Sequence, residues 1–225
     1  MTGCFLPRPS RLTRLQQELL AGFFSRDVGF FLTGGAALAG FYFGHRPTDD
    51  LDLFCLVGEA LEEGQRQLEI AASGCGAALT PLQRYPEFRR LQAVRGEERC
   101  LVDLVFDRAS QVETDKPMQG TVRLDSLREI AANKVAALVG RAEPKDLVDL
   151  RELLAAGADL ALAVEDALRK EGSADPGTLA WLLSELTLGP GARLPPGISA
   201  EELLRFRDEL VPRLRSLAFE MARRR

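Results

Sequence analysis

Three aspartates that lie in or beside apolar runs are the residues best suited to chemistry. Asp50 and Asp52 are separated by one leucine and lead into the run LFCLV at 53–57, and Asp103 is the one charged residue of CLVDLVF at 100–106. Side chains two residues apart in a strand share a face, so the first two carboxylates would lie roughly 7 Å apart, whereas Asp49 points elsewhere. Carboxylates on neighbouring strands can hold one or two Mg2+ ions, and the pattern predicts a site for a hard divalent cation.

Asp103 has two explanations that the sequence leaves open. A carboxylate inside an apolar strand is costly to bury without a partner. That partner is either a metal ion or a positively charged side chain. In the second case Asp103 forms a structural salt bridge.

A glycine pair lies ahead of the acidic residues. Gly34 and Gly35 follow an apolar segment and precede the Ala-rich stretch 36–43, which we expect to be a short buried helix. Backbone N–H groups at such a turn can bind phosphate, and glycine allows a close approach. Each part alone also has a structural explanation, namely tight packing or a solvated surface. Together with the aspartates, the glycines suit nucleotidyl transfer, in which a hydroxyl attacks the α-phosphate of an NTP and pyrophosphate leaves.

The elements that must position these residues alternate between helices and strands up to about residue 125. Apolar spacing predicts an amphipathic helix over residues 10–25, capped by Ser10. The sequence RGEE at 95–98 predicts a hairpin turn, and two prolines predict that residues 80–87 are irregular. The remaining predicted elements are strands over 28–32, 50–57, 88–94 and 100–106 and a surface helix over 59–72.

The chain after residue 125 reads as helices only. Ser126 with Glu129 and Ser199 with Glu202 have the spacing of capping boxes, and Pro144 suits the first turn of a helix that Gly157 ends. We therefore expect an α+β fold with a mixed sheet of about four or five strands in residues 1–125, and a helical domain over residues 126–225.

Composition limits the classes of function. The chain of 225 residues is 46% hydrophobic and 28% charged with a net charge of −4, which is typical of a globular protein and not of one coated for nucleic acid. Basic residues do gather near the predicted hairpin and at the C-terminus, either as a solvated surface or as a local patch for a polynucleotide. The low aromatic content does not indicate a platform for stacking bases.

The cysteines and the apolar segments indicate a cytoplasmic protein without a membrane span. Cys4, Cys55, Cys75 and Cys100 are scattered without a C-x-x-C pair, so a zinc site is not expected and the two cysteines in apolar runs should be reduced core thiols. The N-terminus lacks the continuous apolar region of a signal peptide. The apolar stretch 28–44 is too short and too rich in glycine to cross a membrane.

Four segments together resemble a known family, the AbiEii/AbiGii-type toxin nucleotidyltransferases of the DNA polymerase β-like superfamily. GGAALAGFYFGHRPTDDLDLF at 34–54 is similar to the first family motif, and Asp103 in VDLV resembles the third carboxylate of the superfamily. NKVAALVGR at 133–141 and AEPKDLVDL at 142–150 resemble the second and third family motifs. Thr33 and Pro144 depart from the usual pattern, but neither replaces a chemically required group.

The resemblance implies a role for each residue of the site. Asp50 and Asp52 would bind metal with Asp103 as the third ligand, and Gly34 and Gly35 would receive the triphosphate. Beside the resemblance, the residue types themselves favour Arg46 facing phosphate and Thr48 ordering the loop before the acidic strand. Lys134 would contact phosphate, and Lys145 with Asp146 would complete the pocket in a cleft between the two halves, with either Asp146 or Asp149 as the base.

The resemblance also implies a function, with alternatives. It implies a toxin of a type IV toxin–antitoxin pair, or a relative of the mycobacterial MenT toxins. Such an enzyme would use Mg2+, or Mn2+ in its place, to move a nucleoside monophosphate from an NTP to an RNA acceptor such as the 3′ end of tRNA. A small molecule or a protein hydroxyl is the alternative acceptor. A non-catalytic protein that binds an antitoxin-like partner on the same fold is the alternative class.

Helical spacing predicts which residues of the last two motifs share a face. Lys134 and Arg141 are seven residues apart, and Asp146 and Asp149 are three apart, so each pair lies on one side of its helix. Lys134 lies in an apolar setting and needs an anion, which is either a substrate phosphate or a carboxylate. Asp149 is explained as well by a salt bridge to Lys145 or Arg151 as by function. His45, the sole histidine, is better explained as a structural residue of its loop than as an acid or base.

Overall fold

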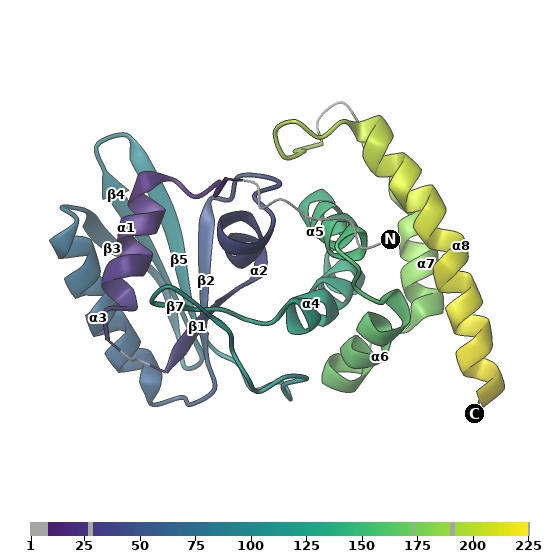
Figure 1. Ribbon diagram of the computed structural model, residues 1–225, viewed down its shortest axis with the longest axis horizontal. Coiled ribbons are helices and arrows are strands. Elements are labelled where there is room, and N and C mark those ends of the chain that lie inside the picture. The colour runs from purple at the N-terminus through teal and green to yellow at the C-terminus, as the bar shows by residue number, and fades with distance from the viewer. Residues whose placement is uncertain (1–8, 27–28, 173, 190–191, 225) are drawn as a thin grey trace. The chain divides into compact units, whose positions relative to one another are not determined.

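The structure of the protein is a computed structural model, which describes residues 9–26, 29–172, 174–189 and 192–224 (Figure 1). The predictions for Cys4, for Val28 and for the terminal Arg225 lie outside these residues. The chain forms two compact units. The first consists of Met1–Arg108 with Asp115–Ser126, and the second of Ala109–Thr114 with Leu127–Arg225.

The first unit is built on a five-stranded mixed sheet with the strand order β1-β2-β5-β4-β3. The central strands β2 and β5 are parallel, and every other neighbouring pair is antiparallel. The strands are β1 (Phe30–Thr33), β2 (Asp50–Cys55), β3 (Ala78–Tyr85), β4 (Phe88–Arg95) and β5 (Glu98–Phe106), with a separate two-stranded sheet of β6 (Met118–Gln119) and β7 (Val122–Arg123). The mixed sheet confirms the predicted α+β class.

Alternation along β2 gives the large sheet two chemically different faces. Leu51, Leu53 and Cys55 are buried, whereas Asp50 and Asp52 on the other face are partly exposed. The two leucines therefore point into the core. The acidic residues therefore share one face of the sheet, as the period of two requires.

Helices α1 (Arg14–Phe23) and α3 (Ala60–Gly74) pack against each other and against the apolar face. The ring of Phe23 meets that of Phe30 edge to face, with centroids 5.5 Å apart. Helix α1 begins later than predicted, because Thr13 and not Ser10 caps it. Thr13 and Gln16 form a capping box, in which each side chain hydrogen-bonds the backbone of the other.

The prediction that residues 80–87 are irregular is wrong, since most of them belong to β3. This strand lies at the edge of the sheet, where one side of the backbone needs no partner. The register shifts between Pro81 and Gln83, which is the kind of irregularity that accommodates a proline. An edge position therefore tolerates a residue that would be excluded from a central strand.

The segment between β1 and β2 is a short helix followed by a loop. Helix α2 (Gly34–Ala37) continues into the π-helix η1 (Leu38–Tyr42), and Ala36, Ala37 and Leu38 are fully buried. The predicted buried Ala-rich helix is confirmed, although it begins at the glycines.

The second unit consists of α4 (Leu127–Gly140), α5 (Pro144–Ala155), α6 (Leu160–Glu171), α7 (Pro176–Glu185) and α8 (Ala200–Arg224). Helix α4 packs against α5, α6 and α7, and α8 packs against α5 and α7. Pro144 occupies the first turn of α5, and Ser199 with Glu202 forms the predicted capping box.

The capping box predicted for Ser126 with Glu129 stays a prediction, and Glu129 has further partners. The buried Glu129 carboxylate accepts hydrogen bonds from the backbone of Val112 and Glu113 and pairs with Lys170. Glu129 thus fixes the segment 109–114 to the helices of its own unit.

Cys55 and Cys100 are buried free thiols, as predicted. Burial raises the pKa of Cys55 to about 11 and that of Cys100 to about 12. Among the described residues, no helix is both long enough and apolar enough to cross a membrane.

Candidate functional site

The three predicted carboxylates lie on the two central strands of the sheet. Asp50 and Asp52 are on β2, and Asp103 on β5 is the Cα partner of Asp52. Partners on adjacent strands point to the same face. Asp103 therefore lies on the same face of the sheet as Asp50 and Asp52.

Both glycines are required by close approaches within the first unit. Gly34 has a φ of +62°, and a Cβ atom there would stand 2.6 Å from Oδ2 of Asp52. A Cβ on Gly35 would stand 2.6 Å from Nη2 of Arg46 and 3.5 Å from Oγ1 of Thr48. The glycine pair thus allows the chain after β1 to lie directly against three of the predicted site residues, Asp52, Arg46 and Thr48.

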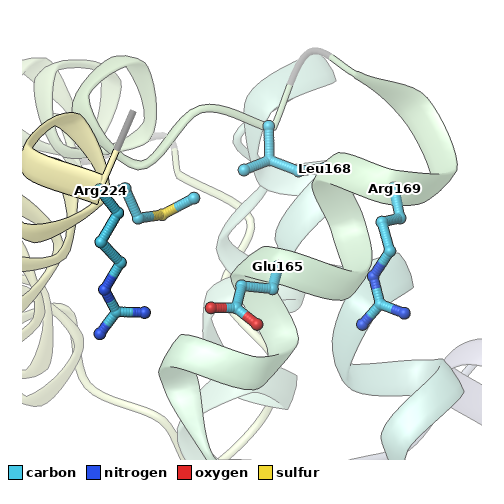
Figure 2. Close-up of a pocket in the computed structure, with 5 residues that line it drawn as sticks. Glu165, Leu168, Arg169 and Arg224 are labelled. Carbon is cyan, nitrogen blue, oxygen red and sulfur yellow. The ribbon is translucent and has the colours of Figure 1, made fainter.

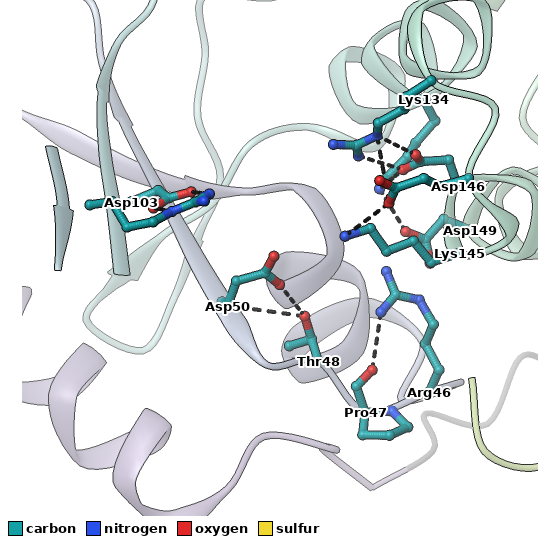
Figure 3. Close-up of polar contacts among 12 residues, drawn as sticks. Arg46, Pro47, Thr48, Asp50, Asp103, Lys134, Lys145, Asp146 and Asp149 are labelled. Carbon is teal, nitrogen blue, oxygen red and sulfur yellow. Dashed lines mark hydrogen bonds and ion pairs between the residues drawn. The ribbon is translucent and has the colours of Figure 1, made fainter. Parts of the chain in front are cut away.

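Thr48 positions the Asp50 carboxylate. Its hydroxyl donates to Oδ1 of Asp50 at 2.7 Å (Figure 3). Its carbonyl accepts from the buried side-chain amide of Gln16 at 2.8 Å, and the same Gln16 closes the capping box of α1. The start of α1 therefore holds the loop that orients Asp50. Arg46 in this loop donates to the carbonyl of Pro47 at 3.0 Å, and the buried ring of His45 packs against Phe43.

Asp103 is held by an arginine. Nε and Nη2 of Arg90 on β4 donate to the two carboxylate oxygens of Asp103 at 2.8 and 2.6 Å. Among the described residues, no three or more His, Cys, Asp or Glu side chains form a group that could hold a metal ion. The role of the three carboxylates as metal ligands stays a prediction. Asp50 and Asp52 form an acidic pair, and Asp103 has the cationic partner that was the alternative explanation.

The remaining predicted residues form an ion cluster in the second unit. The Lys134 ammonium lies 2.8 Å from Oδ1 of Asp146 and 2.7 Å from Oδ2 of Asp149, and Arg141 makes a bidentate pair with Asp146 (Figure 3). Both aspartates are fully buried. The predicted helix faces are thus correct, and Asp149 pairs with Lys134.

Burial and charge act in opposite directions in this cluster. Burial alone would lower the pKa of Lys134, but the charges of Asp149 and Asp146 outweigh it and raise that pKa. Burial would likewise raise the pKa of Asp146, but hydrogen bonds from Arg141 and Lys134 hold it below its usual range. A carboxylate with a lowered pKa and two cationic partners is a weak base, so Asp146 is suited to holding Lys134 in place.

Lys145 is the more accessible of the two predicted lysines. Its ammonium pairs with Glu143 at 3.2 Å, and its side chain is 37% exposed. Lys134 has three N–H donors, of which the two aspartates take two.

Sequence reasoning missed Arg90 and Gln16. Arg90 could have been found by counting, because the hairpin pairs Arg95 with Glu98 and the same register pairs Arg90 with Asp103. Gln16 could have been found from the spacing of Thr13 and Gln16, which fits a capping box better than Ser10 does.

Two cavities of the described residues lie away from the predicted site residues. One of about 320 Å³ in the second unit is lined by residues of α6 and α8, namely Glu165, Leu168, Arg169, Met221 and Arg224 (Figure 2). One of about 370 Å³ in the first unit is lined by Gly58, Glu59, Pro86, Glu87, Phe106 and Arg108. Neither cavity is lined by a residue of the motif segments 34–54 and 133–150, so the acidic pair Asp50 and Asp52 is the stronger candidate for chemistry.

A family model agrees with the resemblance drawn from the sequence. The model, described as a nucleotidyl transferase AbiEii toxin of the type IV TA system, matches residues 18–225. No curated protein sequence matches the chain.

Three solved structures share the fold. JHP933 from Helicobacter pylori is 17% identical, with a TM-score of 0.59 and 93% of each chain covered. Another H. pylori protein, solved as a candidate nucleotidyltransferase, is 16% identical, with a TM-score of 0.61 and coverage of 92% of this chain and 95% of that chain. The nucleotidyltransferase toxin MenT4 from Mycobacterium tuberculosis H37Rv is 14% identical, with a TM-score of 0.60 and coverage of 90% and 85%.

Proposed function

The chain belongs to the AbiEii family of nucleotidyltransferase toxins of type IV toxin–antitoxin systems, and from this premise we propose that it transfers a nucleoside monophosphate to RNA with the help of Mg2+. The family makes the chain a nucleotidyltransferase that uses an NTP, and it implies an antitoxin as partner. The ion, the acceptor and the residue roles are the proposal.

The acidic pair of β2 is the observation that carries the proposal. Mg2+ usually takes one or two carboxylates together with substrate phosphates and water, and Asp50 with Asp52 supplies such a pair. Thr48 fixes one of these carboxylates, and the absence of a Cβ at Gly34 leaves room for the other. An ion held there would neutralise phosphate charge and activate the attacking hydroxyl. The donor set, which consists of oxygens only, fits Mg2+ or Mn2+ better than zinc.

The chain's own cations would hold the triphosphate. In the first unit we assign this task to Arg46 beside Gly35. In the second unit, Lys134 and Lys145 are the phosphate contacts that the family resemblance implies. Lys134 retains one N–H donor beyond those used by Asp146 and Asp149, and these aspartates keep it charged by raising its pKa. Asp146 and Asp149 are thus assigned to orienting the lysine. Arginine and lysine stabilise charge on phosphate groups without exchanging a proton.

The proposed acceptor is the hydroxyl of an RNA, at the 3′ end of tRNA. Support comes from the toxin family and from the basic residues of the hairpin, since an RNA acceptor requires local positive charge on a protein whose net charge is −4. Of these residues, Arg84 is exposed and Arg90 lies on the acidic face of the sheet.

An acceptor screen tests the proposal. The protein is incubated with each α-labelled NTP and Mg2+ in the presence of purified tRNA, other RNA, total protein or small hydroxyl compounds. We expect label on tRNA only, lost when the metal is chelated and lost again when the tRNA 3′ hydroxyl is oxidised beforehand. Label on protein or on a small molecule would contradict the proposed RNA acceptor. If no NTP bound in a Mg2+-dependent way, a non-catalytic protein would be favoured.

A further inference from the structure

A row of three charged residues crosses the acidic face of the sheet. Strands β2, β5 and β4 are consecutive, with Asp52 the Cα partner of Asp103 and Asp103 the Cα partner of Arg90. Neighbouring strands lie about 4.8 Å apart and paired side chains share a face. Asp103 therefore stands between Asp52 of the acidic pair and the cation Arg90.

Arg90 is fixed from two sides. Its guanidinium makes a bidentate pair with Asp103, whose side chain is 7% exposed, and it lies 5.5 Å from the centroid of the Phe88 ring. A planar fork matched to both oxygens of a carboxylate is among the stronger charge-assisted arrangements. A metal ion that used Asp103 as a ligand would have to compete with this pair.

The charges on this face favour a single divalent ion. Asp50, Asp52 and Asp103 bring three carboxylates to this face, and Arg90 places a guanidinium directly against both oxygens of Asp103. A second divalent ion at Asp103 would be repelled by this guanidinium at short range.

We propose that Arg90 takes the place of a second metal ion: one divalent ion binds at Asp50 and Asp52, and Asp103 is a positioning residue that holds Arg90. This inference rests on the proposed function and revises one part of it, the role of Asp103 as a third metal ligand. Two of the five N–H donors of Arg90 go to Asp103. The other three are directed to phosphate oxygens of the nucleotide, where a fixed positive charge stabilises the transferring group.

The number of ions bound per chain tests the inference without any turnover. Mn2+ is titrated into the protein, alone and with a non-hydrolysable NTP analogue, and free Mn2+ is followed by electron paramagnetic resonance. The variants are Asp52→Asn, Asp103→Asn, Arg90→Gln and Arg90→Lys. Arg66→Gln is the matched control, because Arg66 pairs with Glu63 within α3, which packs against the other face of the sheet.

The expected result is one Mn2+ per chain for the wild type, for Asp103→Asn, for Arg90→Lys and for the control. Arg90→Gln keeps hydrogen-bond donors for Asp103 but removes the charge, and it should bind a second ion. Asp52→Asn should weaken the first ion about tenfold or more, since a direct charge is lost at short range. Thermal unfolding of each variant identifies any that does not fold, and Arg90→Ala, for which a second ion is also expected, replaces Arg90→Gln if the latter does not fold.

Two results would overturn the inference alone. They are two Mn2+ ions on the wild-type chain, or a single ion on folded Arg90→Gln. A wild-type protein that binds no Mn2+, with or without the nucleotide analogue, would contradict the proposed function itself, and the inference would fall with it.

Discussion

Gly34→Ala separates the structural from the functional use of the glycine pair. Gly34 has a φ of +62°, and an added Cβ would meet Oδ2 of Asp52 at 2.6 Å. Gly76 has a φ of +71°, and a Cβ there meets no atom within 4 Å. The two glycines therefore share the backbone requirement, but the clash with a proposed metal ligand occurs at Gly34 only.

The sizes of the two effects follow from this geometry. An alanine in the left-handed backbone conformation should lower the free energy of unfolding by about 1–2 kcal/mol at either position. For a chain of this size that lowers the unfolding midpoint by about 2–8 °C. At Gly34 the carboxylate oxygen must also retreat by about 0.8 Å, the difference between an ordinary contact of 3.4 Å and 2.6 Å. A displacement near 1 Å in a reacting group can reduce the rate about 100-fold.

The assay compares both variants with the wild type in thermal unfolding and in transfer of labelled nucleotide. We expect similar losses of stability in the two variants, and a loss of transfer about 100-fold greater in Gly34→Ala than in Gly76→Ala. If Gly34→Ala transferred nucleotide as fast as Gly76→Ala, the Asp52 carboxylate would not need its present position, and the reasoning would be refuted.

Three further predictions concern the supports of the site. Asp146→Asn should lower the free energy of unfolding at neutral pH by about 3 kcal/mol, because it leaves Lys134 and Arg141 with a buried neutral partner. The pKa of Asp146 is lowered in the folded state. Its contribution to the free energy of unfolding is therefore present above the ordinary aspartate pKa and is lost as the pH falls through the pKa of the folded state. The stabilities of the wild type and the variant should therefore converge in acid denaturation. A pH-independent difference would contradict this. Gln16→Leu should lower the free energy of unfolding by about 1–3 kcal/mol and reduce nucleotide transfer, because the Thr48 carbonyl loses a buried hydrogen-bond donor. If this variant were as stable as the wild type, the link from α1 to Asp50 would be contradicted. In thiol labelling at pH 8 with mass mapping, the partly exposed Cys75 should react before Cys55 and Cys100, whose raised pKa values keep them protonated. Equal rates would show that the core opens.

The sequence predicted the sheet well wherever apolar periodicity was clear. Strands β2 and β5 stand out because Leu51, Leu53 and the run at 100–106 alternate or continue as strands do. The edge strand β3 was missed because its prolines exclude only a central position, and nothing local to residues 80–87 shows which neighbour they will have. The two-residue strands β6 and β7 are too short to carry a periodic pattern.

The site was predictable residue by residue but not contact by contact. Helical spacing showed that Lys134 shares a face with Arg141 and that Asp146 shares a face with Asp149. It could not show that the two faces meet, because that depends on the connection between α4 and α5, where Ala142 adopts a φ of 47°. In the same way, the partner of Asp103 depended on the hairpin register, which the sequence places only once the turn is known to the residue.

The central claim is that the acidic pair of β2 carries nucleotidyl transfer. The most direct test is transfer of labelled nucleotide by Asp50→Ala and Asp52→Ala, with Asp49→Ala as the matched control, since Asp49 is exposed and lies just before the strand. The account predicts that both variants of the pair fold as the wild type does and transfer no nucleotide, while the control keeps its activity. Wild-type transfer by either folded variant, Asp50→Ala or Asp52→Ala, would contradict it.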